Sequence, residues 1–122
     1  MTTFDHVHIC CTDLNAMMEF WKNAFGAEFV RLRKFGTADG AVLTLAGTQI
    51  FLKEIPEGSP LPDASACGVN HLGVRVDDPN AMAETLVARF GGRLINKASD
   101  DCSFVAVPGG LTFELMRTGA DI

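Results

Sequence analysis

The sequence predicts an α+β fold of two βαβββ modules, because a phrase near its start returns in its second half. The segment HVHICCTDLNAM, residues 6–17, is similar to HLGVRVDDPNAM, residues 71–82, at the offset of 65 residues that separates His6 from His71. A Phe-Gly pair then follows both segments at the same offset, at 25–26 and 90–91. Such self-similarity indicates an internal repeat of about 60 residues, the signal to seek before any other.

The first half of the chain carries the signals of a strand, a helix and three further strands. Alternating apolar residues from His6 to Cys10 predict a half-buried strand. Asp13 is a candidate N-cap, apolar residues follow it at helical spacing, and Gly26 predicts a left-handed end to that helix. The three short strands predicted after the helix are 28–34, 41–45 and 49–53.

The second half repeats these signals in the same order. Leu72, Val74 and Val76 alternate with polar residues or glycine, Asp78 is the second N-cap candidate, and Pro79 suits the first helical position. The residues predicted on the buried side of this helix are Met82, Ala83, Leu86, Val87 and Phe90, with Gly91 as its end. Three strands are predicted after it, at 93–96, 102–107 and 111–116.

The segment 55–68 separates the two repeats and contains three of the five prolines and two glycines. Such a composition predicts a linker that can swing. We therefore expect one domain, residues 1–122, made of a first module at about 4–54 and a second at about 69–117.

Length, charge and cysteine content limit the class of protein. The 122-residue chain is 48% apolar with a mean hydropathy of +0.19, which is typical of one folded globular domain. Its net charge is −5 and its Lys and Arg are scattered, so we expect neither a nucleic-acid nor a membrane partner. No signal-like start or long apolar run appears, and the four cysteines form no CxxC pair. We expect a cytoplasmic protein with reduced thiols.

Strand alternation also predicts a site. If each helix covers one face of its sheet, the polar residues of the first and last strands must share the other face. Two such faces brought together form a cup with the helices outside. Glu54 falls on the helix side and is not a candidate ligand. The residues predicted to line the cup are His6, His8, Cys10, Gln49, Phe51, Lys53, His71, Gly73, Arg75, Thr112, Glu114 and Met116.

Within the cup, the repeat relates four positions in two pairs. His6 and His71 lead the two modules, and Phe51 and Glu114 lie in their closing strands. A single strand histidine or glutamate is usually structural or solvated, but the joint placement of three ligand types favours a metal site. Two histidines and a carboxylate form the facial triad typical of iron(II), and similar sets accept manganese, zinc or nickel. We predict one divalent ion held by His6, His71 and Glu114.

Other residues of the cup are candidates for chemistry and binding. His8 is predicted as a general acid or base because its pKa is ordinarily near neutral, and a neutral histidine bonded across the sheet is the alternative. Phe51 is predicted to line the substrate pocket. Lys53 and Arg75 are predicted to neutralise an anionic substrate, with solvated strand charges as the alternative.

Three segments resemble the vicinal oxygen chelate superfamily, which includes glyoxalase I, extradiol dioxygenases, fosfomycin-resistance and bleomycin-resistance proteins. They are FDHVHICCTDLNAMMEFWKNAFGAEF, GVNHLGVRVDD and VPGGLTFELM, similar to its opening strand and helix, fifth strand and closing hairpin. The resemblance implies paired βαβββ modules and a divalent metal at the places of His6, His71 and Glu114. The superfamily catalyses many reactions on one scaffold, so the reaction stays open.

Departures from the superfamily pattern leave two hypotheses. Glyoxalase I enzymes usually place a fourth ligand, a glutamate, where this chain has Phe51, so Gln49 or water would have to complete the sphere. One hypothesis is a metal-dependent dioxygenase, lyase or isomerase acting on a small substrate with two vicinal oxygens. The other is a metal-free protein that sequesters a small molecule such as an antibiotic, as bleomycin-resistance proteins do. Exposed sheet edges predict a homodimer, with sites formed within one chain or by a swapped dimer.

Overall fold

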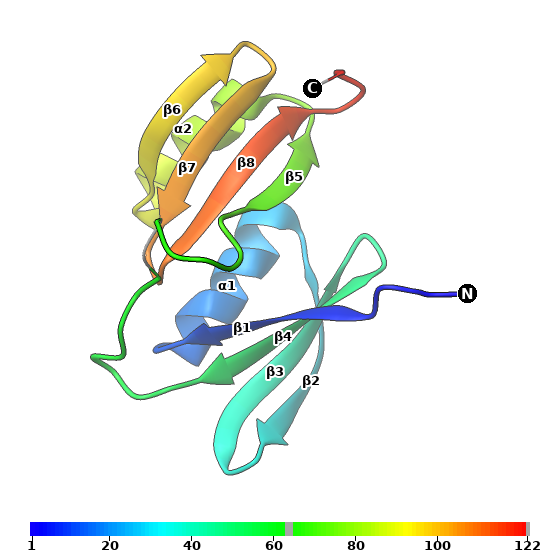
Figure 1. The fold of residues 1–122 in the computed structure, drawn as a ribbon, viewed down its shortest axis with the longest axis vertical. Coiled ribbons are helices and arrows are strands. Elements are labelled where there is room, and N and C mark those ends of the chain that lie inside the picture. The colour runs from blue at the N-terminus through cyan, green and yellow to red at the C-terminus, as the bar shows by residue number, and fades with distance from the viewer. Residues whose placement is uncertain (63–64, 122) are drawn as a thin grey trace. The chain divides into compact units, whose positions relative to one another are not determined.

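Each half of the chain forms one βαβββ module, as the repeat predicts (Figure 1). The computed structural model describes residues 1–62 and 65–121. The chain divides into two units, Met1–Pro60 and Leu61–Ile122, and each contains one module. Asp63 and Ala64 of the predicted linker lie outside the described residues, as does Ile122.

The first unit has a four-stranded sheet in the order β1-β4-β3-β2. β1 runs parallel to β4, and the other two pairs are antiparallel, so the sheet is mixed. Its elements are β1 His6–Cys11, α1 Leu14–Phe25, β2 Glu28–Phe35, β3 Ala38–Leu45 and β4 Thr48–Glu54.

The second unit repeats this topology in the order β5-β8-β7-β6, with β5 parallel to β8. β3 and β6 are each three residues longer than the sequence predicts, whereas the other predicted strand ends agree to within one residue. β3 begins at Ala38 because the hairpin with β2 closes tightly through Gly36, at φ 63°, and β6 continues to Ser99. The elements of this unit are β5 Leu72–Val76, α2 Pro79–Phe90, β6 Arg93–Ser99, β7 Cys102–Val107 and β8 Leu111–Arg117.

Both helices begin and end where the sequence predicts. The Asp13 carboxylate accepts a hydrogen bond from the Ala16 amide at 3.0 Å, and Asp78 caps α2 in the same way. Gly26 and Gly91 end the helices at φ 75° and 69°, a conformation that favours glycine. Neither helix in the described part of the chain is long and apolar enough to cross a membrane.

Each helix packs on one face of its own sheet, which fixes the face that is left open. α1 contacts β3 and β4, and α2 contacts mainly β7. Val87 was expected on the packed side of α2, but it is 44% exposed. Ala83 and Leu86 form the centre of the contact, and Val87 lies roughly 100° further around the helix than Leu86. The buried residues that strands and helices contribute include Ile9, Leu14, Met17, Trp21, Leu43, Ile50, Leu52, Ala83, Leu86, Val105, Phe113 and Leu115.

Candidate functional site

The parallel pairing of β1 with β4 determines which side chains share the face opposite α1. His6 lies opposite Gln49, His8 opposite Phe51, and Cys10 opposite Lys53. Directly opposite residues point to the same side of a sheet. The six residues of these pairs form what we call the open face of unit 1, as the alternation predicts.

The second unit places its candidate ligands in the same way. Gly73 lies opposite Glu114 and Arg75 opposite Met116, and His71 directly precedes β5. Leu72 and Val74 lie opposite the fully buried Phe113 and Leu115, on the helix side. The open face of unit 2 therefore carries Gly73, Arg75, Glu114 and Met116 on β5 and β8.

His71 and Glu114 lie in direct contact. The Nε2 atom of His71 is 3.1 Å from Oε1 of Glu114, and its Nδ1 atom is 2.8 Å from Oδ1 of Asn70. Cys102 donates from its thiol to the other carboxylate oxygen of Glu114 at 3.3 Å. Burial and this carboxylate raise the pKa of the Cys102 thiol, which keeps it protonated as a donor. Both predicted ligands in unit 2 are thus held by neighbours.

His6 has a similar arrangement on the first unit. Its Nδ1 atom lies 2.7 Å from Oδ2 of Asp5, and the amide of Gln49 donates to both Asp5 oxygens at 3.3 Å. The ring of Phe51 stacks on the His6 ring, with centroids 3.9 Å apart and planes 14° from parallel. A partner at Nδ1 orients a histidine and leaves Nε2 as the nitrogen that can bind a metal.

Three residues that orient the candidate ligands were missed from the sequence: Asp5, Asn70 and Cys102. The first two precede His6 and His71 directly, and the repeat offset relates them to each other. That correspondence was available in the sequence as a signal for polar partners of the two histidines. Cys102 carries no such signal, because its contact with Glu114 depends on the pairing of β7 with β8.

The donor atoms in unit 2 fit a divalent metal ion. Two ligand atoms that each bind a metal at about 2.1 Å, at right angles to one another, lie ~3 Å apart. The 3.1 Å between His71 Nε2 and Glu114 Oε1 is close to that separation, and it is also the length of an ordinary hydrogen bond. Within residues 1–62 and 65–121, no three His, Cys, Asp or Glu side chains are gathered as a metal cluster. The triad with His6 therefore stays a prediction, since its members belong to different units.

His8, on the same face as His6, lies among aromatic and positively charged groups. Its ring is 4.5 Å from that of Phe35 and 6.0 Å from that of Phe51, centroid to centroid. Burial lowers the pKa of His8 below its ordinary value, and the nearby charges of His6, Lys53 and Arg33 lower it further. His8 is therefore neutral at pH 7 and suited to accept a proton.

Arg33 joins the open face of unit 1 through an irregularity in β2. Alternation alone assigned no face to Arg33, but a register shift between Phe29 and Arg31 aligns it with Gly40, which in turn lies opposite Lys53. The Arg33 guanidinium carbon is 4.4 Å from the centre of the Phe35 ring. Arg33 is thus a charged residue of this face that the sequence did not identify.

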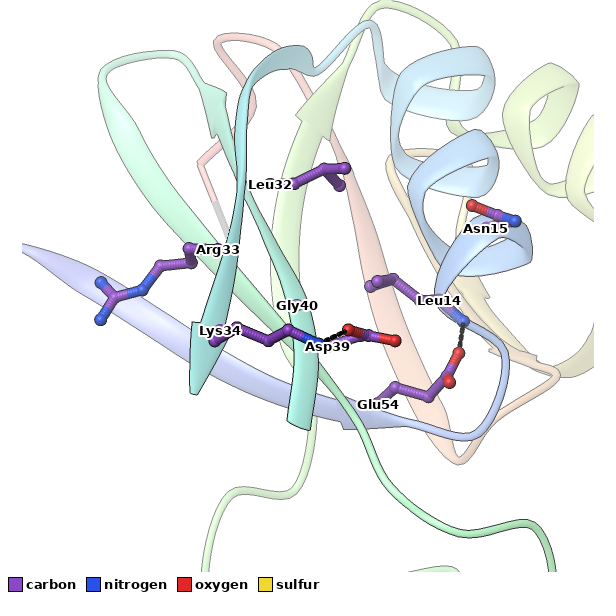
Figure 2. Close-up of a pocket in the computed structure, with 8 residues that line it drawn as sticks. All are labelled: Leu14, Asn15, Leu32, Arg33, Lys34, Asp39, Gly40 and Glu54. Carbon is purple, nitrogen blue, oxygen red and sulfur yellow. Dashed lines mark hydrogen bonds and ion pairs between the residues drawn. The ribbon is translucent and has the colours of Figure 1, made fainter. Parts of the chain in front are cut away.

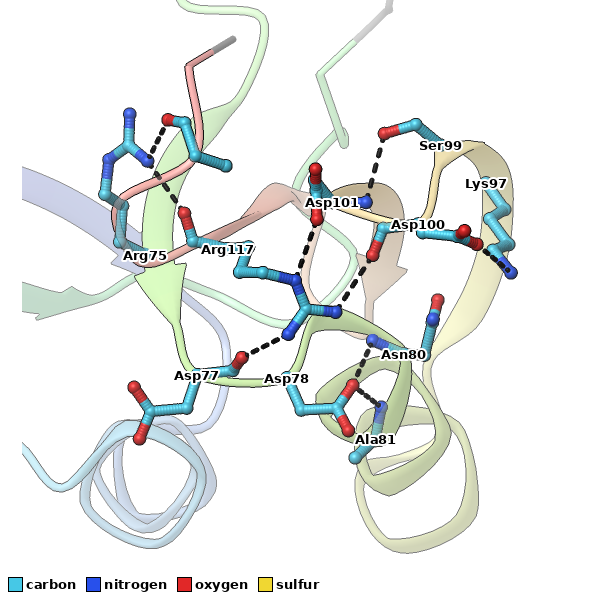
Figure 3. Close-up of polar contacts among 11 residues, drawn as sticks. Arg75, Asp77, Asp78, Asn80, Ala81, Lys97, Ser99, Asp100, Asp101 and Arg117 are labelled. Carbon is cyan, nitrogen blue, oxygen red and sulfur yellow. Dashed lines mark hydrogen bonds and ion pairs between the residues drawn. The ribbon is translucent and has the colours of Figure 1, made fainter.

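Arg75 has structural partners at the end of β8, as Figure 3 shows. Its Nη1 atom donates to the carbonyls of Arg117 and Ala120, at 2.8 and 2.9 Å. These bonds fix the segment that follows β8. A role of Arg75 in substrate binding stays a prediction. Arg117 itself is the centre of a second set of contacts, to the Asp101 carboxylate and the carbonyls of Asp77 and Asp100.

A pocket of about 580 Å³ lies on the helix side of unit 1 (Figure 2). Leu14, Leu32 and Glu54 line it, while the Arg33 side chain points away from it. Glu54 accepts a hydrogen bond from the Leu14 amide at 3.0 Å, which agrees with its exclusion as a ligand. A pocket of about 550 Å³ lies beside α2 in unit 2 and includes Val87. None of the predicted metal ligands lines either pocket.

Comparisons with known proteins agree with this architecture. A family model described as "Glyoxalase-like domain" matches residues 1–116. The trypanothione-dependent glyoxalase I of Leishmania major has a similar structure, with a TM-score of 0.78 and 17% identity over 96% of this chain and 87% of that one. The fosfomycin resistance protein FosX of Listeria monocytogenes, complexed with Mn(II) and sulfate, is also similar. Its TM-score is 0.75, with 18% identity over 96% of this chain and 93% of that one.

A third similar structure is a glyoxylase/bleomycin resistance protein/dioxygenase domain from Frankia sp. EAN1pec. Its TM-score is 0.75, with 19% identity over 96% of this chain and 98% of that one. A search of the curated proteins finds no match. At these identities the similar structures establish the fold alone.

The adjacent cysteines of β1 test the assignment of faces. Cys10 is exposed on the open face, whereas Cys11 is buried on the helix side. Burial, followed by the charge of Glu54, raises the pKa of Cys11 to about 11. The thiolate is the nucleophile, and burial and the raised pKa both lower its accessible amount at Cys11. We therefore expect the rate at which iodoacetamide alkylates Cys11 at pH 8 to be lower than that of Cys10 by a factor of roughly ten or more. Peptide mass spectrometry of quenched samples measures both rates, and equal rates would contradict the assigned faces.

The environment of His8 makes a second prediction. Its NMR titration midpoint in metal-free protein is expected below 6.5, its ordinary value. The positive charge of Lys53 disfavours the imidazolium form, so Lys53→Gln should raise the pKa of His8. Lys34→Gln, which removes a lysine paired with Asp39, is the control and should leave the midpoint unchanged. If Lys53→Gln leaves the titration midpoint of His8 unchanged, the charge of Lys53 does not act on His8, and the prediction is contradicted.

Proposed function

Since the chain belongs to the glyoxalase-like domain family of the vicinal oxygen chelate superfamily, we propose that it is a divalent-metal-dependent enzyme. Its substrate is a small molecule that binds the metal through two vicinal oxygens, in a glyoxalase-like or dioxygenase-like reaction. The observation that carries this proposal is the contact of His71 with Glu114 at the separation expected of two ligands of one ion. The presence of Mn(II) in the similar fosfomycin resistance protein supports it.

The residues that would hold the ion are His6, His71 and Glu114. Neutral imidazoles and an ionised carboxylate accept iron, manganese, zinc or nickel, and three protein ligands leave positions for substrate. When bound, such an ion supplies Lewis-acid stabilisation of negative charge on substrate oxygens. Because the ligands come from both modules, each site needs one module of each kind, supplied by one chain or by two chains of a dimer.

The surrounding residues have distinct roles in this proposal. Asn70 and Asp5 orient the two histidines, and Phe51 supports the His6 ring by stacking on it. His8, which is neutral at pH 7, accepts a proton from the substrate. With Phe51 in place of a fourth donor, the coordination positions left by the triad stay available to substrate or water.

A metal-free binding protein is the second candidate, and one observation favours it. Phe35, Phe51 and the rings of His6 and His8 form an aromatic cluster on the open face of unit 1. Aromatic rings of this kind can hold a planar small molecule without a metal. The similar Frankia domain carries both descriptions, bleomycin resistance protein and dioxygenase. Metal content separates the two candidates.

We expect protein purified without chelator to contain close to one iron, manganese, zinc or nickel ion per chain. His71→Ala should abolish this content because it removes a ligand, as measured by elemental mass spectrometry. His8→Gln is the matched control, since it changes a histidine of the same face as His6 that is not a proposed ligand. If wild-type protein holds no metal and takes up none of these ions, the result contradicts the metal-dependent enzyme and favours the metal-free binding protein.

The orienting contacts lead to a separate prediction. Asn70→Ala leaves all three proposed ligands in place but removes the partner of His71 Nδ1. Loss of such a partner typically weakens metal affinity by roughly 10- to 100-fold. Competition with a chromogenic chelator measures the affinity. Asn96→Ala, a change on β6, is the control. Equal affinities in the Asn70 and Asn96 variants would show that the contact does not orient the ligand.

A further inference from the structure

The basic residues of unit 1 differ in their partners according to the side of the molecule on which they lie. Lys22 pairs with Glu19 on α1, and Lys34 pairs with Asp39 on the helix side of the sheet. Arg31 lies opposite Val42, which lies opposite Phe51, so Arg31 also belongs to the open face. Within Met1–Pro60, no carboxylate lies within 4.0 Å of the charged groups of the open-face cations, which are Arg31, Arg33 and Lys53. These charges gather on one face of a chain whose net charge is −5.

Arg33 is held by aromatic rings in place of a carboxylate. Its guanidinium carbon lies 4.4 Å from the centre of the Phe35 ring and 5.5 Å from that of Phe51. Arginine stacked on a ring face is stabilised there while its N–H groups at the edge of the plane can still bind an anion. The rings therefore position a planar cation and leave its charge unneutralised.

Gly40 permits this arrangement. In the sheet it lies opposite both Arg33 and Lys53, in the row between them. A Cβ atom at this position would be 2.4 Å from the Phe35 ring and 2.6 Å from the Leu52 carbonyl oxygen. The ring of Phe35 thus covers the place where a side chain would stand. Glycine at position 40 therefore leaves room for the Phe35 ring beneath the Arg33 guanidinium. Lys53 lies opposite Gly40 on the next strand, β4.

We propose that Arg33, assisted by Lys53, binds an anionic group of the substrate, so that the substrate is a small carboxylate or phosphoryl compound. The planar N–H groups of arginine match both anions in a two-point contact, and the lysine ammonium adds a second positive charge. The inference rests on the proposed function only for the other end of the substrate, which would chelate the metal. Anion binding by the open face of unit 1 is itself independent of the metal.

The test uses NMR titration of metal-free, full-length protein with benzoate, phenylphosphonate and neutral benzamide. We expect both anions to shift the Nε–H signal of Arg33, which Arg33→Gln identifies by its disappearance, and benzamide to leave that signal in place. Arg33→Gln should weaken binding of the preferred anion roughly fivefold or more, and Arg33→Lys by less. Lys34→Gln, on the same strand but the opposite face, should bind as wild type does. The preferred anion distinguishes a carboxylate from a phosphoryl substrate.

Three results would overturn the inference: no binding of either anion at millimolar concentration, equal shifts with benzamide, or unchanged affinity in Arg33→Gln. Circular dichroism of each variant excludes loss of folding as the cause. Metal content of the same preparation is measured in parallel. Anion binding without any metal uptake would contradict the proposed metal-dependent enzyme but support the anion site. Metal uptake without anion selectivity would contradict the anion site but support the metal-dependent enzyme.

Discussion

The parallel pairing of the first and last strands of each module is the constraint on which the rest of the structure depends. A parallel pair needs a long crossover, and here the crossover contains the helix and two strands that complete the sheet. The helix must cover one face, so polar residues of the paired strands fall on the other. The same pairing places His6 beside Gln49 and Phe51, and His71 beside Glu114, although about forty residues separate the partners in sequence.

The two modules keep this geometry and differ in chemistry. In unit 2 the position beside the histidine is Glu114, whose two carboxylate oxygens accept a hydrogen bond from the Cys102 thiol and contact His71 Nε2. In unit 1 the equivalent position is Phe51, which stacks on His6 and helps to hold Arg33. One copy is therefore rich in donor atoms, and the other in rings and positive charge. The two open faces therefore carry different chemistry on one shared scaffold.

The sequence predicted what depends on local pattern. Period-two alternation, the aspartate N-caps and the glycine ends located both modules and the faces of the paired strands, because these signals act within a few residues. It did not place Arg33, because the irregularity in β2 that sets its face arises from pairing with β3. The carbonyl partners of Arg75 and the thiol partner of Glu114 were also missed, since both contacts join segments distant in sequence. Val87 was misplaced because helical spacing alone does not say how wide the packed side is.

The Glu54 carboxylate accepts a hydrogen bond from the first residue of α1, and this contact limits which substitutions the sheet can tolerate. A slip of one residue in β4 would expose Ile50 and Leu52 and also separate Glu54 from the Leu14 amide, so the helix side penalises any change of register. The side chains of the open face contribute little to that penalty. Substitutions there can alter what is bound while the scaffold stays folded. In such a sheet, the residues that determine stability and the residues that determine what is bound lie on opposite faces, so that each set can change with little effect on the other.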